Sequence, residues 1–111
     1  MSADLQLKVT NVKVKRFGEP KSNVLGVASI LINDLLVIHD IRIVQLKERR
    51  ILSFPAKRVV RTEDSLTGER KYYTYEDIVH PANSEFRKYL EEIIFSQFDV
   101  TGKEGLSEQN Y

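Results

Sequence analysis

The chain begins with a stretch in which apolar and polar residues alternate. Every second residue is apolar from Leu5 to Val9, and the alternation resumes one position out of phase through Val14. A period of two is typical of a strand with one buried face, and a single phase shift is typical of a β-bulge. We therefore predict a first strand over Leu5–Phe17 with a bulge near Asn11.

Two apolar runs follow a loop at residues 18–23. Val24–Ile32 and Leu35–Leu46 are rich in β-branched residues, and the turn-forming pair Asn33-Asp34 separates them. This pattern predicts a β-hairpin with a two-residue turn. Both runs carry apolar side chains at odd and at even positions, so both faces of the hairpin are apolar.

The middle of the chain alternates between short strands and polar segments. Ile51–Phe54 reads as a short strand that ends at Pro55, and Lys57–Arg61 then leaves the sheet. Thr62–Glu69 is polar and contains a glycine, which favours a loop. Arg70–Val79, which contains three tyrosines, reads as a fifth strand.

The apolar period changes near the C-terminal end. Positions spaced i, i+3, i+4, i+7, i+8 and i+12 form one helical stripe: Phe86, Tyr89, Leu90, Ile93, Ile94 and Phe98. Asn83 or Ser84 can cap this helix, and Glu85 suits the positive end of its dipole. The residues after Asp99 are polar, and we expect Thr101–Tyr111 to be a disordered tail.

These elements predict a single α+β domain at residues 1–100, followed by the tail at 101–111. The domain is an antiparallel β-sheet of four to five strands with a C-terminal α-helix. One helix covers only one face of a sheet, and the second face of the central hairpin is also apolar. A second copy of the chain is the simplest cover, so we expect a strand-mediated homodimer.

Composition narrows the protein class. The chain has 111 residues with 41% hydrophobic and 30% charged residues, which is typical of a soluble globular domain. It has no cysteine, no basic-then-apolar leader and no apolar run that spans a bilayer, so we expect a cytoplasmic protein without membrane contact. Residues 1–61 contain 12 basic and 5 acidic side chains, whereas residues 62–111 contain 5 and 11. This asymmetry fits a face for a polyanion, an intramolecular dipole, or complementary faces of a dimer.

Residues with catalytic chemistry are sparse. His39-Asp40 resembles a general-base pair, but on a regular strand neighbouring side chains point to opposite faces. His39 then shares a face with Ile41, and Asp40 shares one with Arg42, so a structural interpretation is favoured. His80 precedes a proline and is expected to bond a backbone group. We expect no enzyme activity, no cofactor, no metal and no small-molecule substrate.

Basic residues alternate with tyrosines around the predicted polar loop. Lys57, Arg58 and Arg61 precede that loop, and Arg70-Lys71 follows it. Folding of the loop brings both groups together with Tyr72, Tyr73 and Tyr75. Aromatic faces stack on bases while Lys and Arg contact phosphates, so this set is a candidate nucleic-acid site. The alternative is a solvated hairpin whose tyrosines pack on the sheet.

A second basic set lies on the first strand, at Lys13, Lys15 and Arg16. Lysines on an edge strand also deter aggregation, and this role explains the set equally well.

Five segments in order resemble the SpoVG (stage V sporulation protein G) family of bacteria. They are Val9-Thr10-Asn11-Val12-Lys13-Val14, Ala28-Ser29-Ile30, Val37-Ile38-His39-Asp40-Ile41-Arg42-Ile43, Phe54-Pro55-Ala56-Lys57-Arg58 and Asp77-Ile78-Val79-His80-Pro81-Ala82-Asn83-Ser84. The resemblance runs from Val9 to the end of the predicted helix.

The resemblance implies a β-sheet with a C-terminal helix, a homodimer joined through strands, and site-preferring DNA binding with RNA binding as well. It also implies a role in septum formation, sporulation and gene expression. Lys57, Arg58 and Arg87 match basic positions of the family and are candidate nucleic-acid contacts. The chain differs from the usual pattern by a longer, partly acidic segment at Val59–Lys71, and by Glu76, where a basic residue is common.

The leading hypothesis is therefore a homodimeric nucleic-acid-binding regulator, whose candidate contacts are Lys57, Arg58, Arg61, Arg70, Lys71 and Arg87. The alternative is a protein-interaction module that regulates septation through protein partners without recognising nucleic acid directly.

Overall fold

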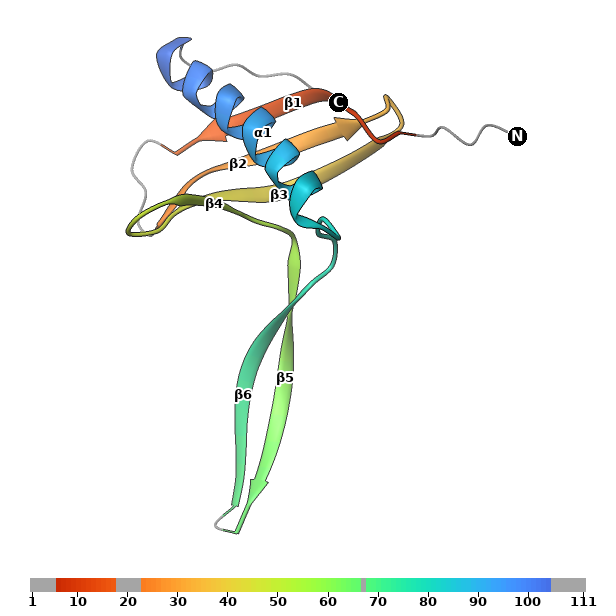
Figure 1. The fold of residues 1–111 in the computed structure, drawn as a ribbon. Helices are drawn as coiled ribbons and strands as arrows, with labels where there is room; N and C mark the ends of the chain where they lie inside the picture. The colour runs from red at the N-terminus through yellow and green to blue at the C-terminus, as the bar shows by residue number, and fades with distance from the viewer. Residues whose placement is uncertain (1–5, 18–22, 67, 105–111) are drawn as a thin grey trace, which may run out of the picture.

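The computed structural model describes residues 6–17, 23–66 and 68–104, and these residues form an antiparallel α+β fold (Figure 1). Four strands form one sheet in the order β1-β2-β3-β4, and two more strands pair separately. The elements in chain order are β1 (Val9–Arg16), β2 (Val24–Ile32), β3 (Leu36–Gln45), β4 (Arg50–Ser53), β5 (Ala56–Ser65), β6 (Gly68–Asp77) and α1 (Ser84–Glu104). The predicted α+β class is confirmed, with six strands in two sheets instead of four to five in one.

The central hairpin of β2 and β3 forms as predicted. Asn33 and Asp34 have φ angles of 52° and 58°. The Leu35 amide donates a hydrogen bond to the Ile32 carbonyl at 2.9 Å. Positive φ at both central residues is the type I′ turn, whose twist matches that of the flanking strands. Asn and Asp tolerate this conformation, which explains the pair at this position.

Besides a register shift between Val24 and Gly26, two β-bulges shape the sheet. The first lies between Val9 and Asn11, where the sequence predicts one. The second lies in β3, where Asp40 has a φ of 62° and the pairing with β2 shifts register. This extra residue resets the alternation, so that Ile38 and Ile41 both face the helix. The prediction that His39 shares a face with Ile41 is therefore wrong, because His39 lies on the opposite face of the sheet.

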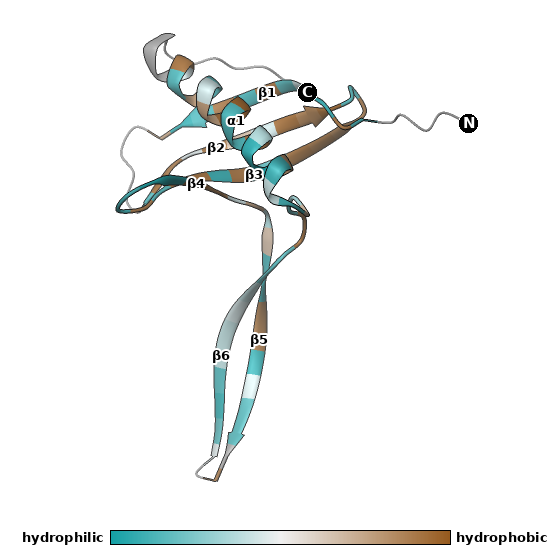
Figure 2. Cartoon of the chain, in the orientation of Figure 1, coloured by the Kyte–Doolittle hydropathy of each residue, from teal (hydrophilic) through white to brown (hydrophobic). Residues whose placement is uncertain are grey.

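The core lies between α1 and one face of the four-stranded sheet. The helix contributes the buried residues Leu90, Ile94 and Phe98 from the predicted stripe. The sheet contributes a buried set that includes Val14, Ala28, Ile30, Ile32, Ile41, Ile43 and Leu52. Figure 2 shows these apolar stretches beneath the helix. We call the other side of the sheet, which α1 does not cover, the open face.

β5 and β6 form a two-stranded arm, residues 56–77, that stands away from the sheet (Figure 1). Their pairing runs without a register shift from Ala56 opposite Asp77 to Ser65 opposite Gly68. The predicted polar loop at 62–69 is therefore wrong, because most of it lies in paired strands. Backbone pairing does not require apolar side chains, so a polar segment can extend a hairpin that Val59, Val60 and the tyrosines favour.

The structure defines both ends of the predicted helix more closely. The Phe86 amide donates a hydrogen bond to Asn83 Oδ1 at 2.8 Å, so Asn83 is the N-cap. At the other end, α1 continues to Glu104, and Thr101 is only 2% exposed. The first four residues of the expected tail are therefore helical, and the domain boundary after residue 100 falls inside the helix. Residues 105–111 lie outside the described residues.

Candidate binding surface

Five of the six candidate contacts lie on the arm, and its register separates them into two groups. Directly paired residues share a face, so Arg58 lies with Tyr75 and Lys71 with Thr62 on one side. Lys57, Arg61 and Arg70 lie on the other side. The arm thus brings the two sequence segments together as predicted, but it divides their positive charges between two faces.

We call the first side of the arm the tyrosine face, and its central residues are Arg58, Val60, Lys71, Tyr73 and Tyr75. Tyr73 is 60% exposed and Tyr75 is 72% exposed. The Arg58 guanidinium lies over the Tyr73 ring, 4.5 Å from its centroid. Both rings are largely exposed, so the alternative that the tyrosines are packed on the sheet does not describe this face.

Acidic side chains lie on both sides of the arm. Asp64, Glu69 and Asp77 share the tyrosine face with Arg58 and Lys71, and Glu63 and Glu76 share the second side with the other three basic residues. Arg61 forms an ion pair with Glu76 and lies 3.4 Å from the Thr74 hydroxyl. Lys57 is also directly opposite Glu76, and Arg70 is opposite Glu63. The two strands together contain five basic and five acidic residues. The arm is therefore neutral overall, with basic groups on both of its faces.

Arg87, the sixth candidate, lies on α1 and not on the arm. Its guanidinium is 5.4 Å from the centre of the Phe54 ring, near the point where the chain enters the arm. It is half-buried, so part of its surface is occupied by this packing.

The open face of the sheet carries basic residues that the candidate set does not include. A single row across the strands contains Lys15, Val27, Arg42 and Ser53. A second row places Lys13 next to Ser29, whose hydroxyl oxygen lies 3.0 Å from His39 Nδ1. Sequence reasoning missed Arg42 because it stands alone between Ile41 and Ile43, and only the pairing of the strands places it in one row with Lys15.

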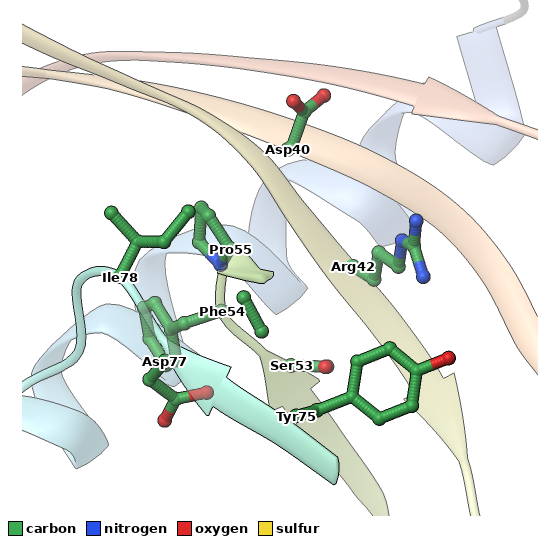
Figure 3. Close-up of a pocket in the computed structure, with 9 residues that line it drawn as sticks. Asp40, Arg42, Ser53, Phe54, Pro55, Tyr75, Asp77 and Ile78 are labelled. Carbon is green, nitrogen blue, oxygen red and sulfur yellow. The ribbon is translucent and has the colours of Figure 1, made fainter. Parts of the chain in front are cut away.

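A pocket of about 550 Å³ lies at the corner where the arm leaves the sheet (Figure 3). Its polar and apolar walls come from the sheet and from the end of the arm, and include Asp40, Arg42, Ser53, Tyr75, Asp77 and Ile78. The pocket therefore joins the open face, through Arg42 and Ser53, to the tyrosine face, through Tyr75.

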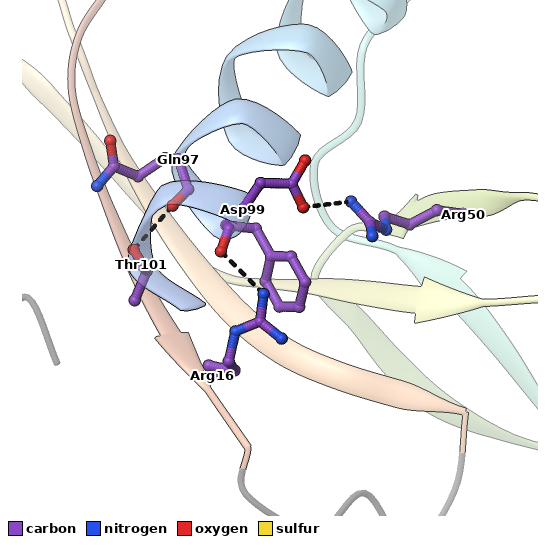
Figure 4. A network of polar contacts seen from close by, with 6 residues as sticks. Arg16, Arg50, Gln97, Asp99 and Thr101 are labelled. Carbon is purple, nitrogen blue, oxygen red and sulfur yellow. Dashed lines mark hydrogen bonds and ion pairs between the residues drawn. The ribbon is translucent and has the colours of Figure 1, made fainter. Parts of the chain in front are cut away.

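Two other arginines hold the end of the helix (Figure 4). Arg16 lies on the helix side of β1, with its guanidinium 3.7 Å from the centre of the Phe98 ring and 3.1 Å from the Phe98 carbonyl oxygen. Arg50 pairs with Asp99 at 3.2 Å. Strand alternation thus divides the second basic set, with Lys13 and Lys15 on the open face and Arg16 against the helix.

The described residues hold no group of three or more His, Cys, Asp or Glu side chains arranged for a metal ion. His80 Nδ1 lies 3.0 Å from the Pro81 carbonyl oxygen, which confirms the predicted bond to the backbone. No helix in the described part of the chain is long and apolar enough to cross a membrane.

Fold and surfaces together define a small α+β domain, with a sheet covered on one face by a helix and a protruding arm that carries exposed tyrosines. The chain belongs to the SpoVG family, whose model matches residues 7–100. This confirms the resemblance found in the sequence.

Three relatives carry the name "Putative septation protein SpoVG". The protein of Phytoplasma australiense is 32% identical over 92 residues, which are 83% of each chain. That of Macrococcus caseolyticus is 33% identical over 95 residues, 86% of this chain and 72% of the relative. That of Borrelia hermsii is 30% identical over 94 residues, 83% of this chain and 86% of the relative.

Proposed function

We propose that this protein is a homodimeric nucleic-acid-binding regulator that acts in the cytoplasm and affects septation, sporulation or gene expression. The observation that carries the proposal is the tyrosine face, where Tyr73 and Tyr75 are exposed between Arg58 and Lys71. Exposed aromatic rings next to cationic side chains are the combination that binds single-stranded nucleic acid, because rings stack on bases while cations neutralise phosphates.

Lys57, Arg61, Arg70 and Arg87 are secondary contacts in this proposal. Lys57 and Arg70 face acidic residues across the arm, and Arg61 is already paired with Glu76. Arg61 must exchange its ion pair with Glu76 for a phosphate, and Arg87 is partly occupied by its packing on Phe54, so these two contribute less to binding than Arg58. A preference for particular DNA sites, with RNA as a second ligand, is part of the proposal because the family resemblance implies it.

Homodimerisation is supported by the arm, whose two strands form a sheet of their own. A two-stranded hairpin without a packed face is marginally stable in water. The arm nevertheless exposes Val60 at 57%, and each of its strands has one partner strand in the described chain. Pairing along a free edge of the arm with a second copy satisfies backbone groups and leaves both faces open. Sedimentation velocity at micromolar concentration should show a dimer, and a stable monomer contradicts this part of the proposal.

A protein-interaction module that regulates septation through protein partners is the second candidate. The septation names of the relatives favour it, and so does the balance of charges on the arm. In this case Tyr73 and Tyr75 contact a protein, and binding to nucleic acid is weak and independent of the tyrosine face.

A salt titration of two charge-matched variants separates the candidates. Fluorescence anisotropy measures binding of single-stranded and duplex oligonucleotides to the parent, to Arg58→Glu/Lys71→Glu and to Lys57→Glu/Arg70→Glu. Both variants change the net charge equally and lie on the same strands, but on opposite faces of the arm. The first variant should lower affinity at low salt at least tenfold, and each lost contact should reduce the salt slope by about 0.7 for a single strand. The second should have a smaller effect.

Two results contradict the proposal. If the parent binds no nucleic acid at low salt, the protein-interaction candidate replaces it. If both variants weaken binding equally, net charge and not the tyrosine face determines affinity. Tyr73→Ala/Tyr75→Ala supplies an independent check, because loss of stacking should cost roughly 1–3 kcal/mol per base without a change in the salt slope.

A further inference from the structure

The corner pocket is lined by polar groups that have no partner among the described residues. Asp40, Arg42, the Tyr75 hydroxyl and Asp77 have no side-chain hydrogen bond or ion pair within the described part of the chain. Ile78, on the same wall, is 67% exposed. A pocket of this size with a few convergent polar groups and exposed apolar walls is typical of a ligand site.

The charges of the pocket favour a base over a phosphate group as the bound part of a nucleic acid. Figure 3 shows the carboxylates of Asp40 and Asp77 at opposite ends of the pocket, with Arg42 and Tyr75 along one side. Two carboxylates repel a phosphate, but they accept hydrogen bonds from the exocyclic amino group of a base. The Tyr75 ring and Ile78 provide flat and apolar surface for the base itself.

Phosphate-binding groups lie on both sides of the pocket. On the sheet side, Lys15 lies two strands from Arg42 in the same cross-strand row, a separation of about 10 Å at the usual strand spacing. On the arm side, Arg58 is directly opposite Tyr75. A strand whose phosphates contact Lys15 and Arg58 therefore passes over the pocket between them.

We propose that the corner pocket binds one unpaired base that carries an exocyclic amino group, such as cytosine or adenine, from a single strand that runs from the open face to the tyrosine face. This inference rests on the proposed function and adds a base preference to it. The amino group donates to Asp40 or Asp77, and Arg42 donates to the base or to its phosphate.

Short oligonucleotides of cytidine and uridine test the preference directly. Both bases are pyrimidines, but cytosine has an amino group where uracil has a carbonyl oxygen. We expect the parent to bind an eight-residue oligo(C) about five- to tenfold more tightly than oligo(U) in anisotropy titrations at low salt, a discrimination at the lower end of that of one good base contact.

Asp40→Asn/Asp77→Asn should reduce this ratio to less than twofold. An amide side chain donates a hydrogen bond to the carbonyl oxygen of uracil as readily as it accepts one from the amino group of cytosine. Asn tolerates the positive φ of Asp40, so the bulge is retained. The control Asp64→Asn/Glu69→Gln removes the same charge at paired positions of the arm that do not line the pocket. It should keep the parent ratio, because a general loss of repulsion strengthens binding of both oligonucleotides equally. Asp77→Asn alone, checked by circular dichroism, replaces the double variant if that variant does not fold.

The outcomes distinguish the two proposals. If the parent binds both oligonucleotides equally and with steep salt dependence, the pocket inference is wrong and the proposed function stands. If the parent binds neither at low salt, the proposed function fails and the inference fails with it. If the pocket variant changes the oligomeric state but keeps the ratio, the pocket is a contact between subunits, which also overturns the inference.

Discussion

The contact of Arg16 with the C-terminal part of α1 gives a sharp test of how the helix is held on the sheet. The Arg16 guanidinium lies 3.7 Å from the centre of the buried Phe98 ring and donates a hydrogen bond to the Phe98 carbonyl at 3.1 Å. Arg16→Met keeps an apolar stem of similar length and removes both interactions. We expect this variant to lose stability while keeping its fold.

The expected loss of stability in Arg16→Met is the sum of the two contributions. A cation–π contact at an exposed site is worth about 0.5–1 kcal/mol. A hydrogen bond from a charged group adds about 1 kcal/mol here, below the usual range because Arg16 is partly solvated. A total of about 1.5–2 kcal/mol lowers the Tm of a domain of this size by roughly 6–15 °C. Thermal unfolding followed by far-ultraviolet circular dichroism measures this loss directly.

Lys15→Met is the matched control. Lys15 is the preceding residue, but its side chain lies on the open face and does not contact the helix. Its replacement should change the free energy of unfolding by no more than about 0.5 kcal/mol. If Arg16→Met and Lys15→Met have the same Tm, the contact with Phe98 does not stabilise the helix and the reasoning is refuted. A double-mutant cycle with Phe98→Leu measures the contact itself, because a true contact gives a coupling above about 0.5 kcal/mol.

Three other substitutions test individual features of the fold by chemical or thermal unfolding. Gly26→Ala places a Cβ 2.5 Å from the Lys15 backbone oxygen, so it should cost about 1–3 kcal/mol, and an unchanged Tm contradicts this close approach. Asn83→Ala should cost about 1 kcal/mol, whereas Ser84→Ala should cost clearly less, and the reverse order means that Ser84 is the cap. Asn33→Ala should cost about 1–2 kcal/mol, because alanine is strained at a φ of 52°, and a neutral result means that the type I′ turn is not required.

Local patterns predicted the body of the fold because each depends on neighbouring residues. The stripe from Phe86 to Phe98 sets the buried side of α1 whatever it packs against, and Asn33-Asp34 favours its turn through its own backbone. The phase shift near Asn11 is also visible in the alternation itself. For the same reason the chemistry of the candidate contacts, basic side chains interleaved with tyrosines, was accessible before the fold was known.

The arm and the bulge at Asp40 depend on pairing between strands, so the chain pattern alone did not give them. Residues 62–65 are polar and resemble a loop, yet they pair with residues 68–71 once β5 and β6 are in register. That register also decides that Arg58 and Lys71 share a face with Tyr73 and Tyr75, while Arg61 pairs with Glu76.

The sequence by itself determined the family, the α+β class and the residue types available for binding. Only the tertiary structure decided which of them lie together. A shift of one residue in a strand moves every later side chain to the other face, and the composition of the chain is the same with or without that shift. The bulge at Asp40 places His39 on the face opposite Ile41, and the pairing of the strands places Arg42 beside the corner pocket, which no count of charges along the chain reveals.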